Sequence, residues 1–184
     1  MKYYLVAMFD DNSYEYVEGL QKSINRKYKL SNNNTLPKPH IILDVIVDPD
    51  LDKFEEIVEK ILRPYKKFKV ELNGLSYIDQ NNKNFNFKIE NKGYIIRIAR
   101  NINSTLKLSG FNVKEIEDQW NLHVPLANNN LASKTQNSKE YTATIDKIKT
   151  LTPYTLAKID RFELWKSINN KKKTVVQTFS LRDC

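Results

Sequence analysis

Hydrophobic and polar residues follow two different periods along this chain, and each change of period marks an expected helix or strand. Residues 2–9, KYYLVAMF, form a nearly continuous apolar run with aromatic and β-branched members, which predicts a buried strand. The next stretch predicts an amphipathic helix whose N-terminal cap is Asn12, with Glu15 three residues later. Its apolar residues recur at helical spacing: Tyr14, Val17, Leu20 and Ile24.

The second element pair has the same order, a strand and then a helix. An Asn- and Pro-containing loop at 30–39 leads into an apolar run at 40–47, which predicts a strand. Asp48 and Pro49 then predict the start of a helix, because proline is tolerated in the first turn. Its apolar stripe consists of Phe54, Ile57, Val58 and Ile61, and Arg63-Pro64 is expected to end it.

Three further strands are predicted in the middle of the chain. Residues 68–72 and 85–89 alternate between apolar and polar side chains, which is typical of half-buried strands. GYIIRIAR at 93–100 follows an Asn-Lys-Gly turn and is predicted as the third strand. A helix is expected at 102–108, with Gly110 just beyond its end as a C-terminal cap.

The last third of the chain predicts a strand at 121–127, a polar loop at 128–138 and a helix over 141–148. Residues 155–167 and 172–181 predict a closing hairpin. Helices mixed with antiparallel pairs indicate an α+β fold. The order of elements repeats loosely, as a pseudo-twofold repeat with one histidine-bearing strand in each half. We therefore expect a single two-lobed domain over residues 1–184.

Composition and charge narrow the classes of partner. The chain has 184 residues and a formal net charge of +8, which favours an anionic partner such as RNA or a nucleotide. The basic run at 171–173 is more simply a solvated turn. No run of apolar residues is long enough for a transmembrane helix, so no membrane partner is expected. The single cysteine, Cys184, excludes a disulfide within the chain, and the N-terminal run is interpreted as a strand and not as a signal peptide. A cytoplasmic protein is expected.

Only two histidines occur in the chain, and they stand in similar contexts. His40 begins the sequence His-Ile-Ile-Leu, and His123 begins His-Val-Pro-Leu. With an unperturbed pKa near 6.5, an imidazole can both take up and release a proton around neutrality, so two of them facing a phosphate can act as base and acid. Either histidine alone would more often be a satisfied residue of a half-buried strand. No metal-ligand cluster is apparent, and we expect no metal and no cofactor.

These paired motifs resemble the H-x-T/S-x signature of the 2H phosphoesterase superfamily, whose bacterial members include 2′-5′ RNA ligase-like proteins and RNA 2′,3′-cyclic phosphodiesterases. The resemblance extends from "PKPHI" at 37–41 through "HVPLA" at 123–127 to the "DRFELWK" and "TFSL" ending. It implies a bilobal α+β fold in which two antiparallel sheets line a central cleft, with helices outside. It also implies His40 and His123 as the catalytic pair of a phosphodiesterase. The implied substrate is RNA or a nucleotide with a 2′,3′-cyclic phosphate or a 2′-5′ linkage.

The motif hydroxyls are missing, and this leaves the function open. Side chains two apart on a strand share a face, so the motif's Thr or Ser would lie beside its histidine. Here those positions are Ile42 and Pro125. Losing one such donor commonly costs roughly two to four kcal/mol of transition-state stabilisation. Lys38, Arg97 and Arg100 are candidate phosphate contacts that could compensate.

Three functions therefore remain. The first is a phosphodiesterase, the second a catalytically weakened RNA- or nucleotide-binding protein on the same fold, and the third a protein-interaction module. The aromatic residues Tyr3, Phe9, Trp120 and Trp165 could stack a base or belong to the core, and they stay unassigned. Three questions are left open: which histidine is the acid, what the natural substrate is, and whether the reaction runs as hydrolysis or as ligation. The frequent Lys and Asn fit a bacterial protein from an AT-rich genome, and a monomer is expected.

Overall fold

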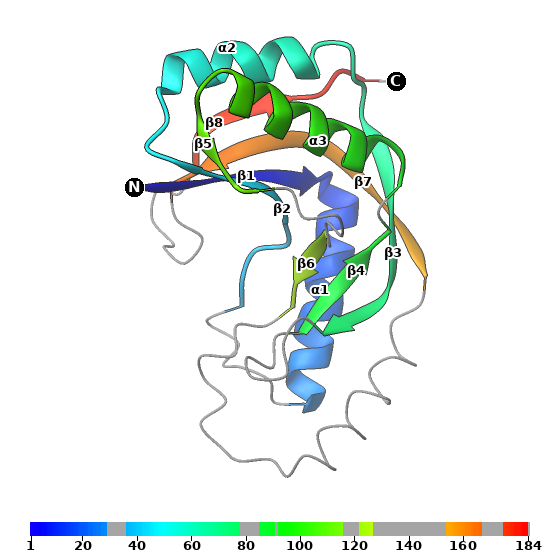
Figure 1. The fold of residues 1–184 in the computed structure, drawn as a ribbon. Helices are drawn as coiled ribbons and strands as arrows, with labels where there is room; N and C mark the ends of the chain where they lie inside the picture. The colour runs from blue at the N-terminus through cyan, green and yellow to red at the C-terminus, as the bar shows by residue number, and fades with distance from the viewer. Residues whose placement is uncertain are drawn as a thin grey trace.

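A computed structural model describes residues 1–28, 36–77, 85–90, 92–115, 122–126, 154–166 and 175–183, and it confirms the α+β fold (Figure 1). The helices are α1 (Asp11–Tyr28), α2 (Leu51–Leu62) and α3 (Gly93–Leu108). The strands are β1 (Lys2–Phe9), β2 (Ile41–Val47), β3 (Phe68–Tyr77), β4 (Phe85–Ile89), β5 (Asn112–Val113), β6 (His123–Pro125), β7 (Thr155–Trp165) and β8 (Val175–Ser180). Among the helices in this part of the chain, none has both the length and the apolar character needed to span a bilayer.

These strands belong to one antiparallel sheet with the order β5-β2-β1-β7-β3-β4-β6, and β8 also pairs with β7. The first half of β7 pairs with β3, and its second half pairs with β1 and β8. Ile159, near the middle of β7, pairs with Phe9 and with Phe68. The two expected sheets are therefore two parts of one continuous sheet, joined through β7.

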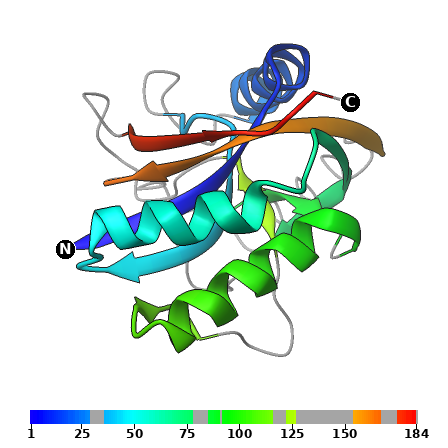
Figure 2. The same cartoon turned by 90° about the horizontal axis from the view of Figure 1, so that it is seen from above.

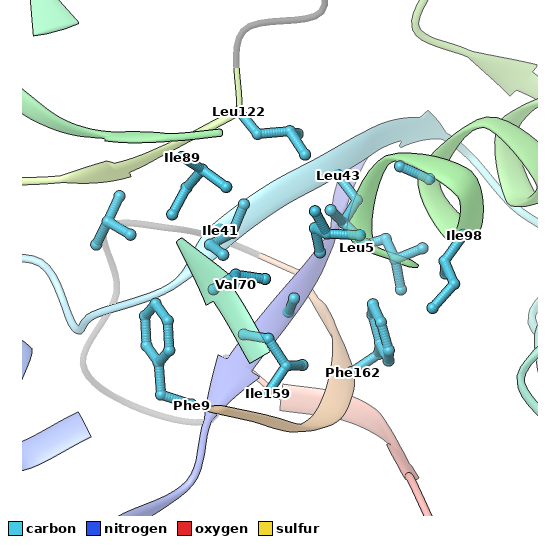
Figure 3. Close-up of a cluster of buried hydrophobic side chains, with 14 of the residues drawn as sticks. Leu5, Phe9, Ile41, Leu43, Val70, Ile89, Ile98, Leu122, Ile159 and Phe162 are labelled. Carbon is cyan, nitrogen blue, oxygen red and sulfur yellow. The ribbon is translucent and has the colours of Figure 1, made fainter. Parts of the chain in front are cut away.

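Two helices cover one face of the sheet. Figures 1 and 2 show α2 and α3 lying side by side over the part that contains β1, β2 and β7. Buried side chains from this face form the main core, and Figure 3 shows Leu5, Leu43 and Phe162 of the strands near Ile98 of α3. Burial of apolar surface between helices and sheet is thus the main source of stability for this half of the fold.

The strand predicted at 93–100 is wrong, because these residues form the first half of α3. The buried positions of this helix follow a spacing of three and four residues, which is the helical period and not the alternation of a strand. They are Ile95, Ile98, Ala99, Ile102, Asn103 and Leu106. The predicted end of the helix is confirmed: Gly110 follows it with a φ of 87°, a conformation that favours glycine at the C-terminal cap.

The other predicted boundaries differ in detail. Asp10, and not Asn12, caps α1, since its Oδ1 accepts a hydrogen bond from the backbone N–H of Ser13 at 2.9 Å. Asp50 caps α2 by accepting from the Lys53 N–H at 3.2 Å. The hairpin of β7 and β8 is confirmed, and the short β5 was not predicted. The predicted loop at 128–138, the predicted helix at 141–148 and the basic run at 171–173 lie outside the described residues.

A second, smaller apolar cluster lies on the sheet face opposite α2 and α3. Strand alternation sends Val6 and Met8 of β1 away from the main core, where they pack with Trp165 of β7. The partly buried Tyr4, Tyr14 and Ile42 pack against this group. We call these six residues the Trp165 cluster, and it borders the candidate site.

Candidate active site

His40 lies directly before β2, in the chain that enters the sheet from the proline-rich segment. Its side chain is completely buried, and its ring meets Trp165 with the ring centroids 4.8 Å apart and an interplanar angle of 47°. Its Nδ1 is 2.6 Å from the backbone carbonyl oxygen of Lys38. Because a carbonyl oxygen only accepts hydrogen bonds, Nδ1 carries the proton and donates it. The ring is thereby fixed in one tautomer.

The other ring nitrogen of His40, Nε2, consequently carries a lone pair. Nε2 is buried, and no hydrogen-bond partner for it exists among the described residues. A buried polar atom without a partner is uncommon, because buried acceptors are normally hydrogen-bonded. Nε2 is therefore an unsatisfied acceptor enclosed in the described part of the protein.

Burial lowers the pKa of His40 to about 4. The hydrogen bond with the Lys38 carbonyl raises the pKa but does not offset the burial, and the charge of His123 lowers it further. His40 is thus neutral at neutral pH. β2 and β6 are in contact, so the segments that carry the two histidines are neighbours in the fold.

His123 is the first residue of β6, a strand that pairs with β4 on one side and ends the sheet. The neighbouring Leu122, Val124 and Leu126 are buried and anchor this short strand in the main core. His123 itself is half-buried, since alternation along the strand directs it and Pro125 away from that core. The strand thus presents an accessible imidazole, whereas that of His40 is enclosed.

A glutamine of α1 connects the two histidine-bearing segments. The buried Gln21 donates through Nε2 to the carbonyl oxygen of Pro125 at 2.6 Å and to that of Pro37 at 3.3 Å. Pro37 lies three residues before His40, and Pro125 lies two after His123. Sequence reasoning missed Gln21. The available signal was a polar residue between Val17 and Ile24 on the apolar stripe of the helix.

The two substituted motif positions have different surroundings. Ile42 packs in the Trp165 cluster, on the side of the sheet where His40 meets the indole. Pro125 pairs with Asn86 of β4, and its missing N–H is tolerated because β6 is the last strand of the sheet. Neither position supplies a hydroxyl.

The structure separates the three candidate cationic contacts. The side chain of Lys38 is exposed, and its backbone carbonyl accepts the hydrogen bond from Nδ1 of His40. Arg97 lies over the ring of Tyr94 and, like Arg100, is exposed on the side of α3 away from the sheet. His40 packs on the opposite face of the sheet, so the structure does not bring these two arginines to it.

A family model described as the AKAP7 2′5′ RNA ligase-like domain matches residues 10–174, which is most of the chain. The chain belongs to this family. It is part of the 2H phosphoesterase superfamily, so the resemblance predicted from the two histidine motifs is confirmed. No curated protein matches the sequence.

Solved structures similar to this RNA ligase-like domain have little sequence in common with it, and they show its fold. TT0787 of Thermus thermophilus has a TM-score of 0.64 at 16% identity, with 100% of this chain and 99% of that chain covered. The apo form of E. coli LigT has a TM-score of 0.61 at 10% identity, with 99% and 98% covered. Usb1 of Kluyveromyces marxianus has a TM-score of 0.50 at 12% identity, with 98% of each covered.

The connection through Gln21 generates a first prediction. Gln21→Met keeps the length of the side chain but removes the donor to both proline carbonyls, so the free energy of unfolding should fall by roughly 1–3 kcal/mol. The NMR signals of both imidazoles should also shift. Lys22→Met is the matched control, because Lys22 is exposed and forms its ion pair with Glu18 on the same helix. Equal urea midpoints and unchanged histidine signals in the two variants would contradict the role of Gln21.

The low pKa of His40 generates a second prediction. The unfolded chain binds a proton at His40 below about pH 6.5, whereas the folded protein does so only below about 4. The stability associated with neutral His40 is therefore complete above the unfolded pKa and is lost as the pH falls through this window, by about 3 kcal/mol. His40→Gln should show a shallower loss of unfolding free energy over the same window. Parallel curves for the variant and the unaltered protein would refute the burial-induced shift.

Proposed function

We propose that this protein is a two-histidine phosphodiesterase that acts on a 2′,3′-cyclic phosphate or on 2′-5′-linked RNA or nucleotide. The observation that carries the proposal is the state of His40: a fixed Nδ1–H tautomer with an unpaired Nε2, next to the charge of a second histidine. The net charge of +8 supports an anionic substrate. Structures of E. coli LigT with 3′-AMP, ATP, NADP+ and phosphate support a nucleotide or phosphate ligand.

In this mechanism His40 is the general base and His123 is the general acid. Nε2 of His40 removes a proton from water while the water oxygen forms a bond to phosphorus. His123 donates a proton to the leaving ribose oxygen as the phosphorus–oxygen bond of the ring breaks, so that charge and protons balance. The arriving phosphodiester anion raises the proton affinity of His40, because a nearby negative charge favours the imidazolium. In the direction of ligation the two roles are exchanged.

The same proposal treats residues 1–184 as one two-lobed domain. His40 borders the part of the sheet that contains β1 and β2, whereas His123 belongs to the part with β3 and β4. Because β7 is hydrogen-bonded to both parts, the two histidines are carried by one continuous framework. Catalysis by a pair of groups requires such a fixed relative position.

The experiment that tests the proposal measures turnover of 2′,3′-cyclic nucleotides and of RNAs with a 2′,3′-cyclic end, in the presence of a chelator. His40→Ala and His123→Ala should each lower kcat by at least about a hundredfold, since each removes one proton-transfer group. Lys107→Ala, on the exposed side of α3, is the surface control and should keep full activity. Circular dichroism verifies that each variant is folded. Alanine variants as active as the unaltered protein would refute the mechanism.

The alternative, a catalytically weakened RNA- or nucleotide-binding protein, is favoured by the same structure at the motif positions. The Ile42 side chain is apolar and packs in the Trp165 cluster, and Pro125 has neither a hydroxyl nor a backbone N–H, so neither side chain donates a hydrogen bond to a phosphate. Binding of nucleotide without turnover, in the unaltered protein and in both histidine variants, would select this alternative.

Restoring one motif hydroxyl distinguishes the two functions further. Ile42→Thr keeps the β-branched shape and adds a donor beside His40, so kcat on the cyclic substrate should rise by about tenfold or more. Ile42→Val is the matched control, because it trims the same side chain without adding a hydroxyl. If the threonine variant is no faster than the valine variant, the missing hydroxyl does not limit the reaction.

A further inference from the structure

Three side chains of β7 form a hydrogen-bonded row next to the candidate site. Arg161, Glu163 and Trp165 are two residues apart and share one face of the strand. The indole Nε1–H of Trp165 donates to Oε2 of Glu163 at 2.7 Å, and Nε of Arg161 donates to Oε1 of the same carboxylate at 2.7 Å. Both oxygens of a carboxylate that is only 7% exposed are therefore occupied. The orientation of the indole is fixed by this bond.

The row is anchored at its other end by Arg161. One of its terminal nitrogens donates to Oδ1 of Asp160 at 2.9 Å and to the carbonyl oxygen of Phe9 at 3.4 Å. Partial burial lowers the pKa of Arg161, but the bonds to Glu163 and Asp160 outweigh it and raise the pKa. The guanidinium is therefore charged, and it compensates the buried carboxylate that holds Trp165.

Trp165 extends this row to His40. The two ring centroids are 4.8 Å apart, within the range of about 6 Å in which an aromatic face attracts a cation. While His40 is neutral the contact is ordinary ring packing. Once Nε2 takes up a proton, the imidazolium lies against the electron-rich indole and gains an electrostatic attraction that the neutral ring lacks. The contact therefore favours the product of proton transfer to His40 over the starting state.

We propose that Trp165 is a positioning residue for His40, that Glu163 and Arg161 hold its indole in place, and that the indole face stabilises the imidazolium formed when His40 accepts a proton. That Glu163 and Arg161 hold the indole against His40 follows from the hydrogen bonds of the row and from the ring contact. The catalytic part rests on the proposed function, because it requires His40 to act as a base.

The charged and titratable groups around His40 come from several elements. His123 of β6 acts on it directly, and the Lys38 carbonyl accepts from its ring. Tyr14 of α1 packs in the Trp165 cluster, where burial and the charge of Glu18 raise its pKa, and the charges of Arg161 and Glu163 act on it less. A change at Trp165 leaves all of these groups in the protein, so its effect on His40 can be measured by itself.

The test compares Trp165→Phe with Phe162→Leu. The first variant keeps an aromatic ring but loses the N–H and the stronger indole face. The second alters a buried aromatic residue of the same strand that belongs to the main core, so it lowers stability without touching His40. Glu163→Gln is added as a milder change, because it keeps the shape of the side chain and removes its charge.

Two measurements are made on each variant: the long-range ¹H–¹⁵N NMR signals of the His40 imidazole as a function of pH, and kcat and KM on a 2′,3′-cyclic nucleotide. In Trp165→Phe we expect a lower His40 pKa, an unchanged Nδ1–H tautomer, since the Lys38 carbonyl still accepts from the ring, and an unchanged KM. The expected loss in kcat is about tenfold, or roughly 1.4 kcal/mol. Glu163→Gln should change the same quantities in the same direction by less, and Phe162→Leu should leave the His40 signals unchanged.

The NMR measurement decides the positioning of His40 even in the absence of turnover. If the unaltered protein does not turn over the substrate, the proposed function fails, while the titration still reports whether Trp165 acts on His40. Identical His40 titrations in Trp165→Phe and Phe162→Leu would overturn the inference. A KM effect without a kcat effect would also overturn its catalytic part.

Discussion

The shared use of β7 is the constraint on which the rest of the structure depends. Its first half completes the part of the sheet that ends in β6, and its second half lies between β1 and β8. The register of β7 shifts near its middle, where it pairs with β1, and near its end, where it pairs with β8. Such irregularities let one strand pair with both parts of the sheet. The same strand carries Trp165 against His40. The element that joins the two parts of the sheet is therefore also the element that positions the enclosed histidine.

Burial of His40 has opposing consequences for chemistry. It keeps the imidazole neutral, while the hydrogen bond to the Lys38 carbonyl fixes one tautomer. Burial also makes His40 a weak base, since a pKa of about 4 disfavours proton uptake. A phosphate anion beside Nε2 and an aromatic face behind the ring both favour the protonated state. Under the proposed function, substrate binding itself supplies the proton affinity that the empty site lacks. The half-buried His123 has no such enclosure, and under the same proposal it takes the opposite role.

The sequence predicted the elements whose pattern is long and regular, including β1, β2, α2 and the β7–β8 hairpin. It failed at the start of α3, where an Asn-Lys-Gly turn and three isoleucines imitate a strand; only the spacing of Ile95, Ile98 and Ile102 reveals the helix. The fold family followed from the two histidine contexts. The connection of those contexts through Gln21 could not be predicted, because it joins residues more than a hundred positions apart. The Arg161–Glu163–Trp165 row was equally hidden, since alternation along a strand says nothing about which neighbour each side chain meets.

The missing hydroxyls and the row on β7 belong to the same physical environment. Ile42 stands where the motif has a hydroxyl and packs in the cluster that contains Trp165, so the surroundings of His40 are apolar on this side. A hydroxyl there would offer a hydrogen bond to a phosphate, whereas isoleucine offers only packing to the indole. Lower polarity strengthens the remaining electrostatic contacts of the site, among them the attraction between an imidazolium and the indole face. The motif position without a hydroxyl and the aromatic contact of His40 thus lie in the same apolar environment.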